Sequence, residues 1–205
     1  MKSKSKYKRG IYYMTRTTLN DRDYQILEMM KTFHIMTNRC ASIYFNGKNP
    51  TTCASRRLKK IYELKSNINR YRENVTSEYI YYYNKRRNNY KHDLIRLEAY
   101  TMLKLNPQIK IIKYKLEKEF VINNTKVRCD LCLVVKNLVN NQIIPILLEI
   151  DLSHRHNDKY KNLDYNKYFG GIKPVIISVG RFTPTTDDIL FIKLNEIETL
   201  KDLVL

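Results

Sequence analysis

The sequence predicts an α+β protein in two parts: a helical part that ends in a short β-hairpin, and a part of mixed helices and strands. Three observations lead to this prediction. Apolar residues recur at helical spacing between residues 21 and 65, and a nearly continuous apolar run occupies residues 143–148. A polar, basic stretch, Lys85-Arg86-Arg87-Asn88-Asn89, separates the two regions. A chain of 205 residues is long enough for one large domain or two small ones.

The first part should begin with two helices. Asn20, with Asp23 three residues later, is a variant of the capping box and opens a helix over about residues 21–34. Thr37 is the cap candidate of a short second helix over residues 40–45, which Asn46-Gly47 ends.

A third helix should begin at Asn49-Pro50 and end near Lys65, with Ala54, Leu58, Ile61 and Tyr62 facing inward. Residues 67–83 have the pattern of two strands around a polar turn. We expect the tyrosines at 79 and 81–83 to pack in a half-buried strand rather than stack on bases, because tyrosine favours strands. Three helices followed by such a hairpin indicate a winged helix-turn-helix over residues 19–84, a module that usually binds duplex DNA.

The third helix carries the predicted DNA contacts. Its early residues are short and polar, which suits base edges, while its cations suit phosphates. The alternative for the cations is an ordinary solvated helix face. The two arginines of the hairpin are expected to reach a flanking minor groove. The predicted DNA-binding residues are Arg39, Thr51, Thr52, Ser55, Arg56, Arg57, Lys59, Lys60, Arg70 and Arg72.

The charge of the chain also favours a polyanionic partner. Its 38 Lys and Arg residues outnumber 20 Asp and Glu residues, for a formal net charge of +18. Residues 1–75 hold 17 of these cations and only 5 acids. Residues 1–18 form a basic arm that either binds phosphates or is a disordered tail. No apolar run approaches the roughly 18 residues of a membrane span, so we expect a cytoplasmic protein associated with nucleoid or plasmid DNA.

After a linker over residues 85–90, the second part should occupy residues 91–205. A helix is expected over residues 91–105, then strands over residues 110–121, 127–135, 143–150, 175–179 and 189–194. A crossover helix should lie around residues 158–168, and an amphipathic helix at the C-terminus. Pro145 should mark a strand entrance or a bulge, because proline cannot donate to a sheet. These elements predict an α/β sandwich.

Acidic residues mark a candidate site in this second part. Asp130 lies in one strand, and Glu149 and Asp151 lie two residues apart at the end of the next, on one side of it. Glu98 is expected to approach from the preceding helix. Such carboxylates suit Mg²⁺, and the pattern resembles the PD-(D/E)XK nuclease core. Asp151 stands where that core has a lysine, so Lys159 or Lys161 would have to supply the cation. The alternative is a structural acid cluster.

The four cysteines are expected to be reduced thiols. Cys129 and Cys132 have CxxC spacing, but residues three apart in a strand face opposite sides of a sheet. A zinc or redox centre is therefore disfavoured, because no second ligand pair accompanies them.

The two parts together resemble the replication-relaxation family of plasmids, phages and integrative elements. The resemblance spans roughly residues 19–180, and its most specific blocks are residues 19–23 and 56–64. Further matches are His92-Asp93-Leu94, Arg128-Cys129-Asp130, Leu148-Glu149-Ile150-Asp151 and the predicted helix at 161–165. The chain departs from the family at Cys129, where a proline or small residue is usual, and at Leu152-Ser153-His154, where Arg-Gly-Thr is usual.

The resemblance implies a winged-helix DNA-binding domain fused to a nuclease-like domain that acts in plasmid replication and DNA relaxation. In this family Glu-x-Asp in place of Glu-x-Lys is normal. The leading hypothesis is a non-enzymatic binder of double-stranded DNA that needs no cofactor. The alternatives are a Mg²⁺-dependent nickase or endonuclease using Asp130, Glu149 and Asp151, and a transcriptional repressor. The expected partners are double-stranded DNA, a second copy of the chain, and replication or relaxation proteins.

Overall fold

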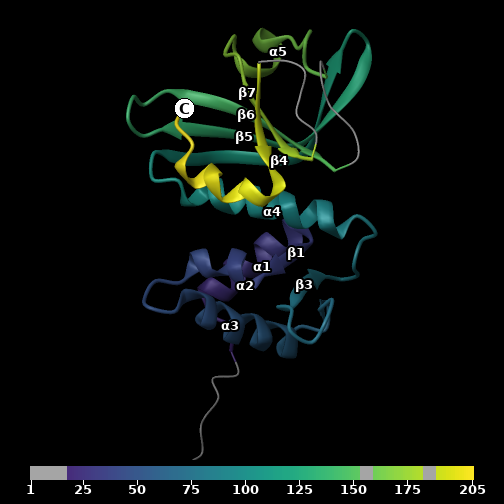
Figure 1. Ribbon diagram of the computed structural model, residues 1–205, viewed down its shortest axis with the longest axis vertical. Coiled ribbons are helices and arrows are strands. Elements are labelled where there is room, and N and C mark those ends of the chain that lie inside the picture. The colour runs from purple at the N-terminus through teal and green to yellow at the C-terminus, as the bar shows by residue number, and fades with distance from the viewer. Residues whose placement is uncertain (1–17, 153–158, 182–187) are drawn as a thin grey trace, which may run out of the picture.

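The computed structural model describes residues 18–152, 159–181 and 188–205. Its layers follow one another along the long axis of the molecule: α3 at one end, then α1 and α2, then α4, then a five-stranded sheet, and α5 at the other end (Figure 1). The protein is a mixed α and β structure, as predicted, and its larger sheet combines antiparallel and parallel strands. The predicted basic arm falls almost entirely on residues 1–17, which lie outside the described residues.

The N-terminal unit is built from three helices and three short strands. Its capping box is present as predicted: the Asn20 side chain accepts from the Asp23 backbone N–H, and the Asp23 carboxylate accepts from the Asn20 N–H at 2.8 Å. Thr37 caps α2 in the same way as predicted. The elements are α1 (Asp21–Phe33), β1 (Ile35–Thr37), α2 (Asn38–Ala41), the 3₁₀ turn η1 (Ser42–Tyr44), α3 (Pro50–Leu64), β2 (Ile68–Tyr71) and β3 (Ile80–Tyr83).

The sheet of this unit has one strand more than the sequence predicted. β2 and β3 form the expected antiparallel hairpin, but β1 pairs with the other edge of β3, giving the order β1-β3-β2. No local pattern indicates β1, because a three-residue strand is too short to show any alternation. The tyrosines of β3 pack in this small sheet with Tyr81 buried, in line with the expected strand packing.

The C-terminal unit begins with α4 and continues into the five-stranded sheet, ordered β4-β5-β6-β7-β8. β4, β5 and β6 run antiparallel, whereas β6, β7 and β8 run parallel. Pro145 is the third residue of β6 and lies opposite Val134, while pairing with β7 begins only at Ile146. The elements are α4 (Tyr90–Leu105), β4 (Ile109–Ile122), β5 (Thr125–Asn137), β6 (Ile143–Asp151), α5 (Tyr165–Phe169), β7 (Val175–Gly180), β8 (Ile189–Lys193) and η2 (Leu194–Asp202).

Two predicted helices of this unit differ in the structure. The crossover helix expected at about 158–168 is only α5, because residues 159–162 form turns and Asp164 caps the helix that follows. The amphipathic C-terminal helix is a 3₁₀ helix, η2, which packs on α4.

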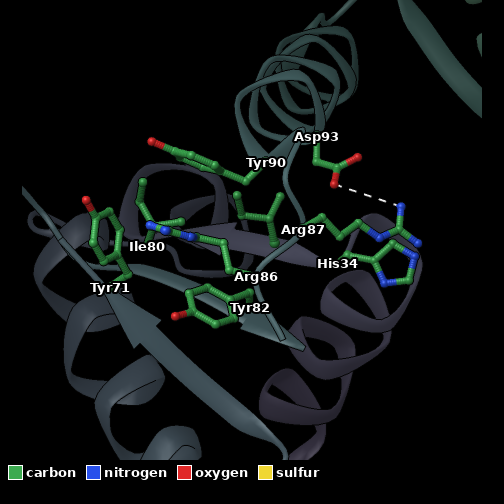
Figure 2. Close-up of a pocket in the computed structure, with 9 residues that line it drawn as sticks. His34, Tyr71, Ile80, Tyr82, Arg86, Arg87, Tyr90 and Asp93 are labelled. Carbon is green, nitrogen blue, oxygen red and sulfur yellow. Dashed lines mark ion pairs between the residues drawn. The ribbon is translucent and has the colours of Figure 1, made fainter. Parts of the chain in front are cut away.

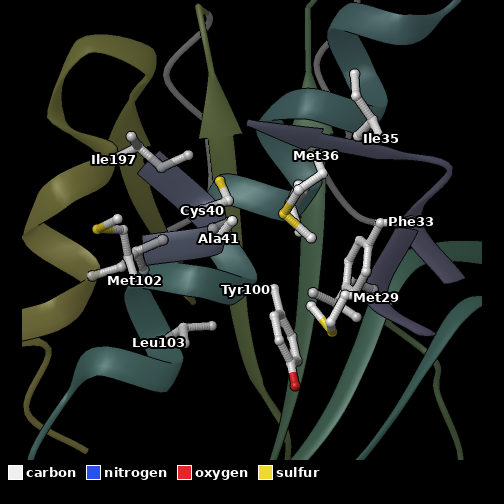
Figure 3. Packing of buried hydrophobic residues seen from close by; sticks show 14 of the residues in the cluster. Met29, Phe33, Ile35, Met36, Cys40, Ala41, Tyr100, Met102, Leu103 and Ile197 are labelled. Atoms are coloured by element: carbon white, nitrogen blue, oxygen red, sulfur yellow. The ribbon is translucent and has the colours of Figure 1, made fainter. Parts of the chain in front are cut away.

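One hydrophobic core joins the two units. The ring of Phe33 from α1 lies 5.0 Å from that of Tyr100 in α4 and 5.8 Å from that of Tyr114 in β4, measured between centroids. Figure 3 shows Met29 and Phe33 beside Tyr100, and Cys40 and Ala41 near Met102 and Ile197 of the C-terminal unit. The predicted linker therefore connects two units that share buried side chains.

We predict that Phe33→Ala lowers the free energy of unfolding by about 3–5 kcal/mol, because it opens a cavity where α1, α4 and β4 meet. Urea unfolding followed by circular dichroism should still show one transition, since the shared core couples the units. The matched control is Tyr24→Ala on the outer side of α1, where the side chain is 52% exposed and the loss should be small. Two separate transitions, of which only one moves, would contradict the coupling.

Candidate functional site

The outer face of α3 is polar and basic. Ala54, Leu58 and Ile61 are fully buried against the rest of the N-terminal unit. Thr52, Arg56 and Lys59 recur at spacings of four and three residues on the opposite side, and all three are exposed. The helix lies at the end of the molecule (Figure 1), so no other described element covers this face. α3 therefore presents an exposed face that carries a short polar side chain, Thr52, and two cations, Arg56 and Lys59.

The other predicted residues of α3 flank this face. Thr51 is exposed in the first turn, after Pro50 at the helix start, while Ser55 and Lys60 are half-buried at its margins. Glu63 lies one turn after Lys59, with 3.8 Å between Lys59 Nζ and Glu63 Oε1. An exposed pair at this spacing contributes little to stability, so Lys59 remains available to a phosphate.

Arg57 has a structural role, in contrast to its predicted DNA contact. Its Nε donates to Asp23 Oδ1 at 2.7 Å, and its Nη2 donates to Asp23 Oδ2. Asp23 is fully buried and also completes the capping box of α1. Through this fork, Arg57 fixes α3 against the start of α1 and sets the direction in which the outer face of α3 points.

The hairpin arginines stack on tyrosines instead of extending freely. The guanidinium carbon of Arg70 lies 4.5 Å from the ring centroid of Tyr62 in α3 and 4.3 Å from that of Tyr79. The guanidinium carbon of Arg72 lies 5.0 Å from the ring centroid of the same Tyr79. The Nη1 of Arg72 donates a hydrogen bond to the Val75 carbonyl at 3.0 Å. These contacts hold the charge of Arg70 beside α3 and the charge of Arg72 on the hairpin.

Arg39 and Glu98 lie elsewhere than the sequence predicted. Arg39 Nη2 lies 2.5 Å from Glu198 Oε1 of η2, on the side of α2 that faces the C-terminal unit. Burial raises the pKa of Glu98, and the nearby charge of Arg39 opposes that shift. Glu98 thus lies beside Arg39, Glu78 and Glu198 and does not line the cavity that holds Asp130 and Glu149.

The junction between the hairpin and α4 is closed by the predicted linker. Arg86 lies over the rings of Tyr71 and Tyr90, with its guanidinium carbon 4.3 Å and 5.2 Å from their centroids. Arg87 Nη1 lies 3.9 Å from Asp93 Oδ2, the pair marked in Figure 2. The cavity between these residues measures about 10 Å³, too small for a ligand larger than water. The junction therefore positions the hairpin and is not a binding pocket.

A second candidate site is an open cavity of about 570 Å³ at the edge of the large sheet. Asp130 of β5 and Glu149 of β6 both line it, as the sequence predicted. The Ile150 N–H donates to Asp130 Oδ2 at 2.8 Å, and His92 Nε2 from α4 lies 3.3 Å from Asp130 Oδ1. The rim is basic, with Lys126, Arg128 and Lys159.

Glu149 is the most perturbed acid of this cavity. Burial, followed by the charge of Asp130, raises its pKa to about 7. Lys159 Nζ donates to Glu149 Oε2 at 2.7 Å, and the Tyr160 hydroxyl donates to Glu149 Oε1, and both contacts oppose the shift. For Asp130, burial would raise the pKa, but the hydrogen bond and charge of His92 outweigh it and the pKa is lowered. The pKa of Glu149 is thus raised while that of Asp130 is lowered, and enzymes use such pairs of carboxyl groups as a general acid and a general base.

Asp151 does not join Asp130 and Glu149 in the cavity, so the predicted acidic triad is reduced to a pair. Asp151 is buried and accepts a hydrogen bond from the Ser178 hydroxyl of β7. A Cβ added to Gly180 would lie 2.6 Å from the Asp151 Cβ, so glycine at 180 is what lets β7 lie against this residue. Lys161 is exposed and does not line the cavity, while Lys159 supplies the cation beside Glu149.

Three residues that contact the two acids, His92, Lys159 and the buried Tyr160, have no assigned role in the sequence-based prediction or only an alternative one. His92 was noted only within a motif, Lys159 was one of two candidates, and Tyr160 was not considered.

Cys129 and Cys132 were expected on opposite faces, but both belong to the core cluster that includes Tyr160. The reason is that Asp130 pairs with neither β4 nor β6, so the alternation of β5 breaks there. Both thiols are free and buried.

Within the described parts of the chain, no group of three or more His, Cys, Asp or Glu residues could hold a metal ion. In the same residues, no helix has the length and apolar character needed to cross a membrane. Comparison with family models gave no match, and neither curated proteins nor solved structures gave one.

The raised pKa of Glu149 predicts a pH-dependent stability. The folded protein holds a proton on this group up to about pH 7, whereas the unfolded chain releases it near pH 4.5. The contribution of Glu149 to the free energy of unfolding is therefore fully present below the pKa of the unfolded chain. It is lost as pH rises through the pKa of the folded protein. Glu149→Gln should remove this decline, so that its stability relative to wild type rises by roughly 2–4 kcal/mol between pH 5 and pH 8. Urea unfolding across that range measures it, and parallel curves for the two proteins would contradict it.

Proposed function

We propose that this chain is a double-stranded DNA-binding protein that places the outer face of α3 in a major groove. The observation that carries the proposal is the exposed row of Thr52, Arg56 and Lys59, backed by a fully buried apolar side. Short polar groups on such a helix suit base edges, and the cations suit phosphates on either side. The stacked Arg70 and Arg72 extend the basic surface to the hairpin.

The order of elements supports a winged helix-turn-helix interpretation of residues 19–84. α1, α2 and α3 are followed by the β2–β3 hairpin, with β1 as a third strand, and this is the arrangement in which the last helix reads DNA and the hairpin flanks it. The order of α4, β4 to β6, α5 and β7 likewise supports a nuclease-like interpretation of residues 91–205. On the resemblance stated above, the protein acts in replication or DNA relaxation of a bacterial plasmid, phage or integrative element, as a homodimer on its DNA site.

The double substitution Arg56→Gln, Lys59→Gln should weaken binding to duplex DNA and lower the dependence of log K on log salt by about 2, because each lost phosphate contact contributes about 0.9. Mobility-shift titrations of origin fragments at several salt concentrations measure both effects. Lys31→Gln, Lys201→Gln is the control with the same charge change, and it should bind like wild type. An equal loss in the control would show that net charge and not α3 governs affinity.

Sequence reading by α3 has a separate test. Thr52→Ala should cost about 1–3 kcal/mol of discrimination between the preferred site and a site with one altered base pair, while leaving the salt dependence unchanged. Thr51→Ala and Ser55→Ala complete the series. Equal affinity of all variants for every sequence would remove sequence-specific recognition from the proposal. Footprinting on the promoter of its own gene would distinguish a transcriptional repressor, which uses the same surface on different DNA.

A second candidate function, a Mg²⁺-dependent DNA nickase, is favoured by the paired acids of the cavity. Mg²⁺ in proteins is commonly held by one or two carboxylates and keeps several waters, so Asp130 and Glu149 fit it once Lys159 releases Glu149. When bound, the ion would polarise a phosphate and lower the pKa of a bound water. His92, which contacts Asp130, would orient that carboxylate, and Lys159, once released from Glu149, would neutralise charge on a phosphate oxygen.

If the cavity is catalytic, supercoiled plasmid with Mg²⁺ or Mn²⁺ should be converted to the nicked form by the wild-type protein. Asp130→Asn should abolish this conversion, whereas Asp151→Asn, outside the cavity, should retain it in any folded fraction. Agarose gels of plasmid incubated with each protein measure the product. Nicking that persists in Asp130→Asn would assign the activity to a contaminant or another site, and absence of nicking in wild type would leave the binding function alone.

A further inference from the structure

A row of lysines lies on one face of the large sheet, on the side that carries α5. Lys110, Lys113 and Lys115 of β4 are exposed, and Lys118 of β4 and Lys136 of β5 are half-buried beside them. We refer to Lys110, Lys113, Lys115, Lys118 and Lys136 as the lysine face. The other side of the same strands carries Tyr114, Leu131 and Leu133, which join the core over α4.

The lysines share this face only because β4 is irregular. Lys110 and Lys113 are three residues apart and would point to opposite sides of a regular strand. The register shift between Ile111 and Lys113 adds one residue, so Lys110 lies opposite Lys136 and Lys113 lies opposite Val134. Beyond Glu117, whose φ is 50°, Lys118 returns to this side and lies 5.0 Å from the ring centroid of Phe169 in α5.

The lysine face lacks internal counter-charges. Among the residues that the structure describes, none of its five members forms an ion pair, and Lys110 lies directly opposite Lys136. Like charges directly opposite each other on a sheet destabilise it. Glu117 forms ion pairs with Arg96 and Arg128, so it does not compensate the charges of the lysine face. An uncompensated row of this kind is complementary to a regularly spaced polyanion.

The lysine face and the outer face of α3 are at opposite ends of the molecule. The sheet covers α4 with its apolar side, the N-terminal unit lies on the far side of α4, and α3 is the outermost helix of that unit (Figure 1). A duplex seated on α3 therefore does not extend along β4. Any phosphates on the lysine face belong to a different segment of DNA.

We propose that the lysine face binds the backbone of a second DNA segment, so that one protein molecule bridges two duplexes. The proposal rests on the proposed function for the first duplex, which α3 holds. Lysine ammonium groups bind phosphates as point charges without reading bases, so the second contact is independent of sequence and sensitive to salt. Bridging gives the chain a role in pairing DNA segments beyond recognition of a single site.

The test is a capture assay with the full chain. An immobilised duplex that carries the preferred site is loaded with protein, washed, and offered a second, fluorescent duplex of unrelated sequence. Wild type should retain the second duplex, with a log–log salt dependence that falls by about 2–3 in Lys110→Gln, Lys113→Gln, Lys115→Gln, since three phosphate contacts are lost. That variant should still bind the immobilised duplex like wild type.

Two matched proteins serve as controls. Lys31→Gln, Lys193→Gln, Lys201→Gln has the same charge change away from the lysine face, and Lys110→Arg, Lys113→Arg, Lys115→Arg keeps the charge. Both should capture the second duplex as wild type does. Thermal unfolding of all four proteins identifies any variant that has lost its fold, and the arginine variant keeps the test valid if the glutamine variant is unstable.

The outcomes separate this inference from the proposed function. Wild type that binds the first duplex but captures no second one overturns bridging and leaves DNA recognition by α3 intact. Capture by the glutamine variant with the affinity and salt dependence of wild type also overturns it, because a dimer with two α3 surfaces would then be the bridge. If Arg56→Gln, Lys59→Gln binds the first duplex normally, the proposed function fails instead. Lysine-dependent binding to phosphatidylserine vesicles without DNA capture would reassign the face to membranes and overturn the proposal.

Discussion

The burial of α4 on two opposite sides is the constraint on which the rest of the structure depends. Leu97, Ala99, Tyr100, Met102 and Leu103 are all buried, and the helix contacts α1, β1 and α2 on one side and β4, β6 and η2 on the other. A helix that is apolar around most of its circumference belongs inside a protein. Because α4 is the shared wall of both units, it sets which way α3 points relative to the sheet. The polar residues of α4 lie on different sides of the helix: His92 lies beside Asp130 of the cavity, and Glu98 lies near Arg39.

Buried charges fix the beginning of this helix. Arg96 is almost completely buried, and its Nη2 lies 2.6 Å from Asp93 Oδ1 and its Nη1 3.4 Å from Glu117 Oε1. Removing one member of a buried ion pair typically costs 3–5 kcal/mol, roughly, since it leaves a buried charge uncompensated. Glu117 is also the residue at which β4 turns its side chains over. Arg96 and its two acids therefore connect to the linker through Asp93 and Arg87, and to the rim of the cavity through Glu117 and Arg128.

The parts of this fold that sequence predicts are those with strong local signals. The capping box at Asn20, the proline that opens α3, and the apolar run of β6 each specify an element within a few residues. β1, the 3₁₀ form of η2 and the shortness of α5 depend on tertiary pairing that no local pattern contains. The shared core was equally hidden, because the basic linker has the composition of a domain boundary.

The acids of the cavity show the same division. Asp130 and Glu149 were predictable from their positions on neighbouring strands, and they do meet. The spacing of Glu149 and Asp151 correctly placed them on one side of β6, but spacing does not reveal that β7 approaches Asp151 closely enough to bury it. The contact between Arg57 and Asp23 could not be predicted from the sequence for a similar reason. In sequence it is one more cation of α3, and only the fold brings it to a buried aspartate.

The distribution of cations then argues against a charge that serves solubility alone. Arg57, Arg87 and Arg96 are engaged with carboxylates inside the protein, so the remaining surplus is carried by surfaces. A surface charged only for solubility is best mixed in sign, because interspersed charges avoid both self-repulsion and adhesion to polyanions. The outer face of α3 is mainly positive, with Glu63 beside Lys59, and the five members of the lysine face are all cations. Each arrangement depends on a specific feature: the Arg57 fork in one and the register shift of β4 in the other. Structural features that concentrate like charges cost stability, and they are explained when an anion offsets that cost. On the two proposals made for these surfaces, DNA would be the anion at both ends of the molecule.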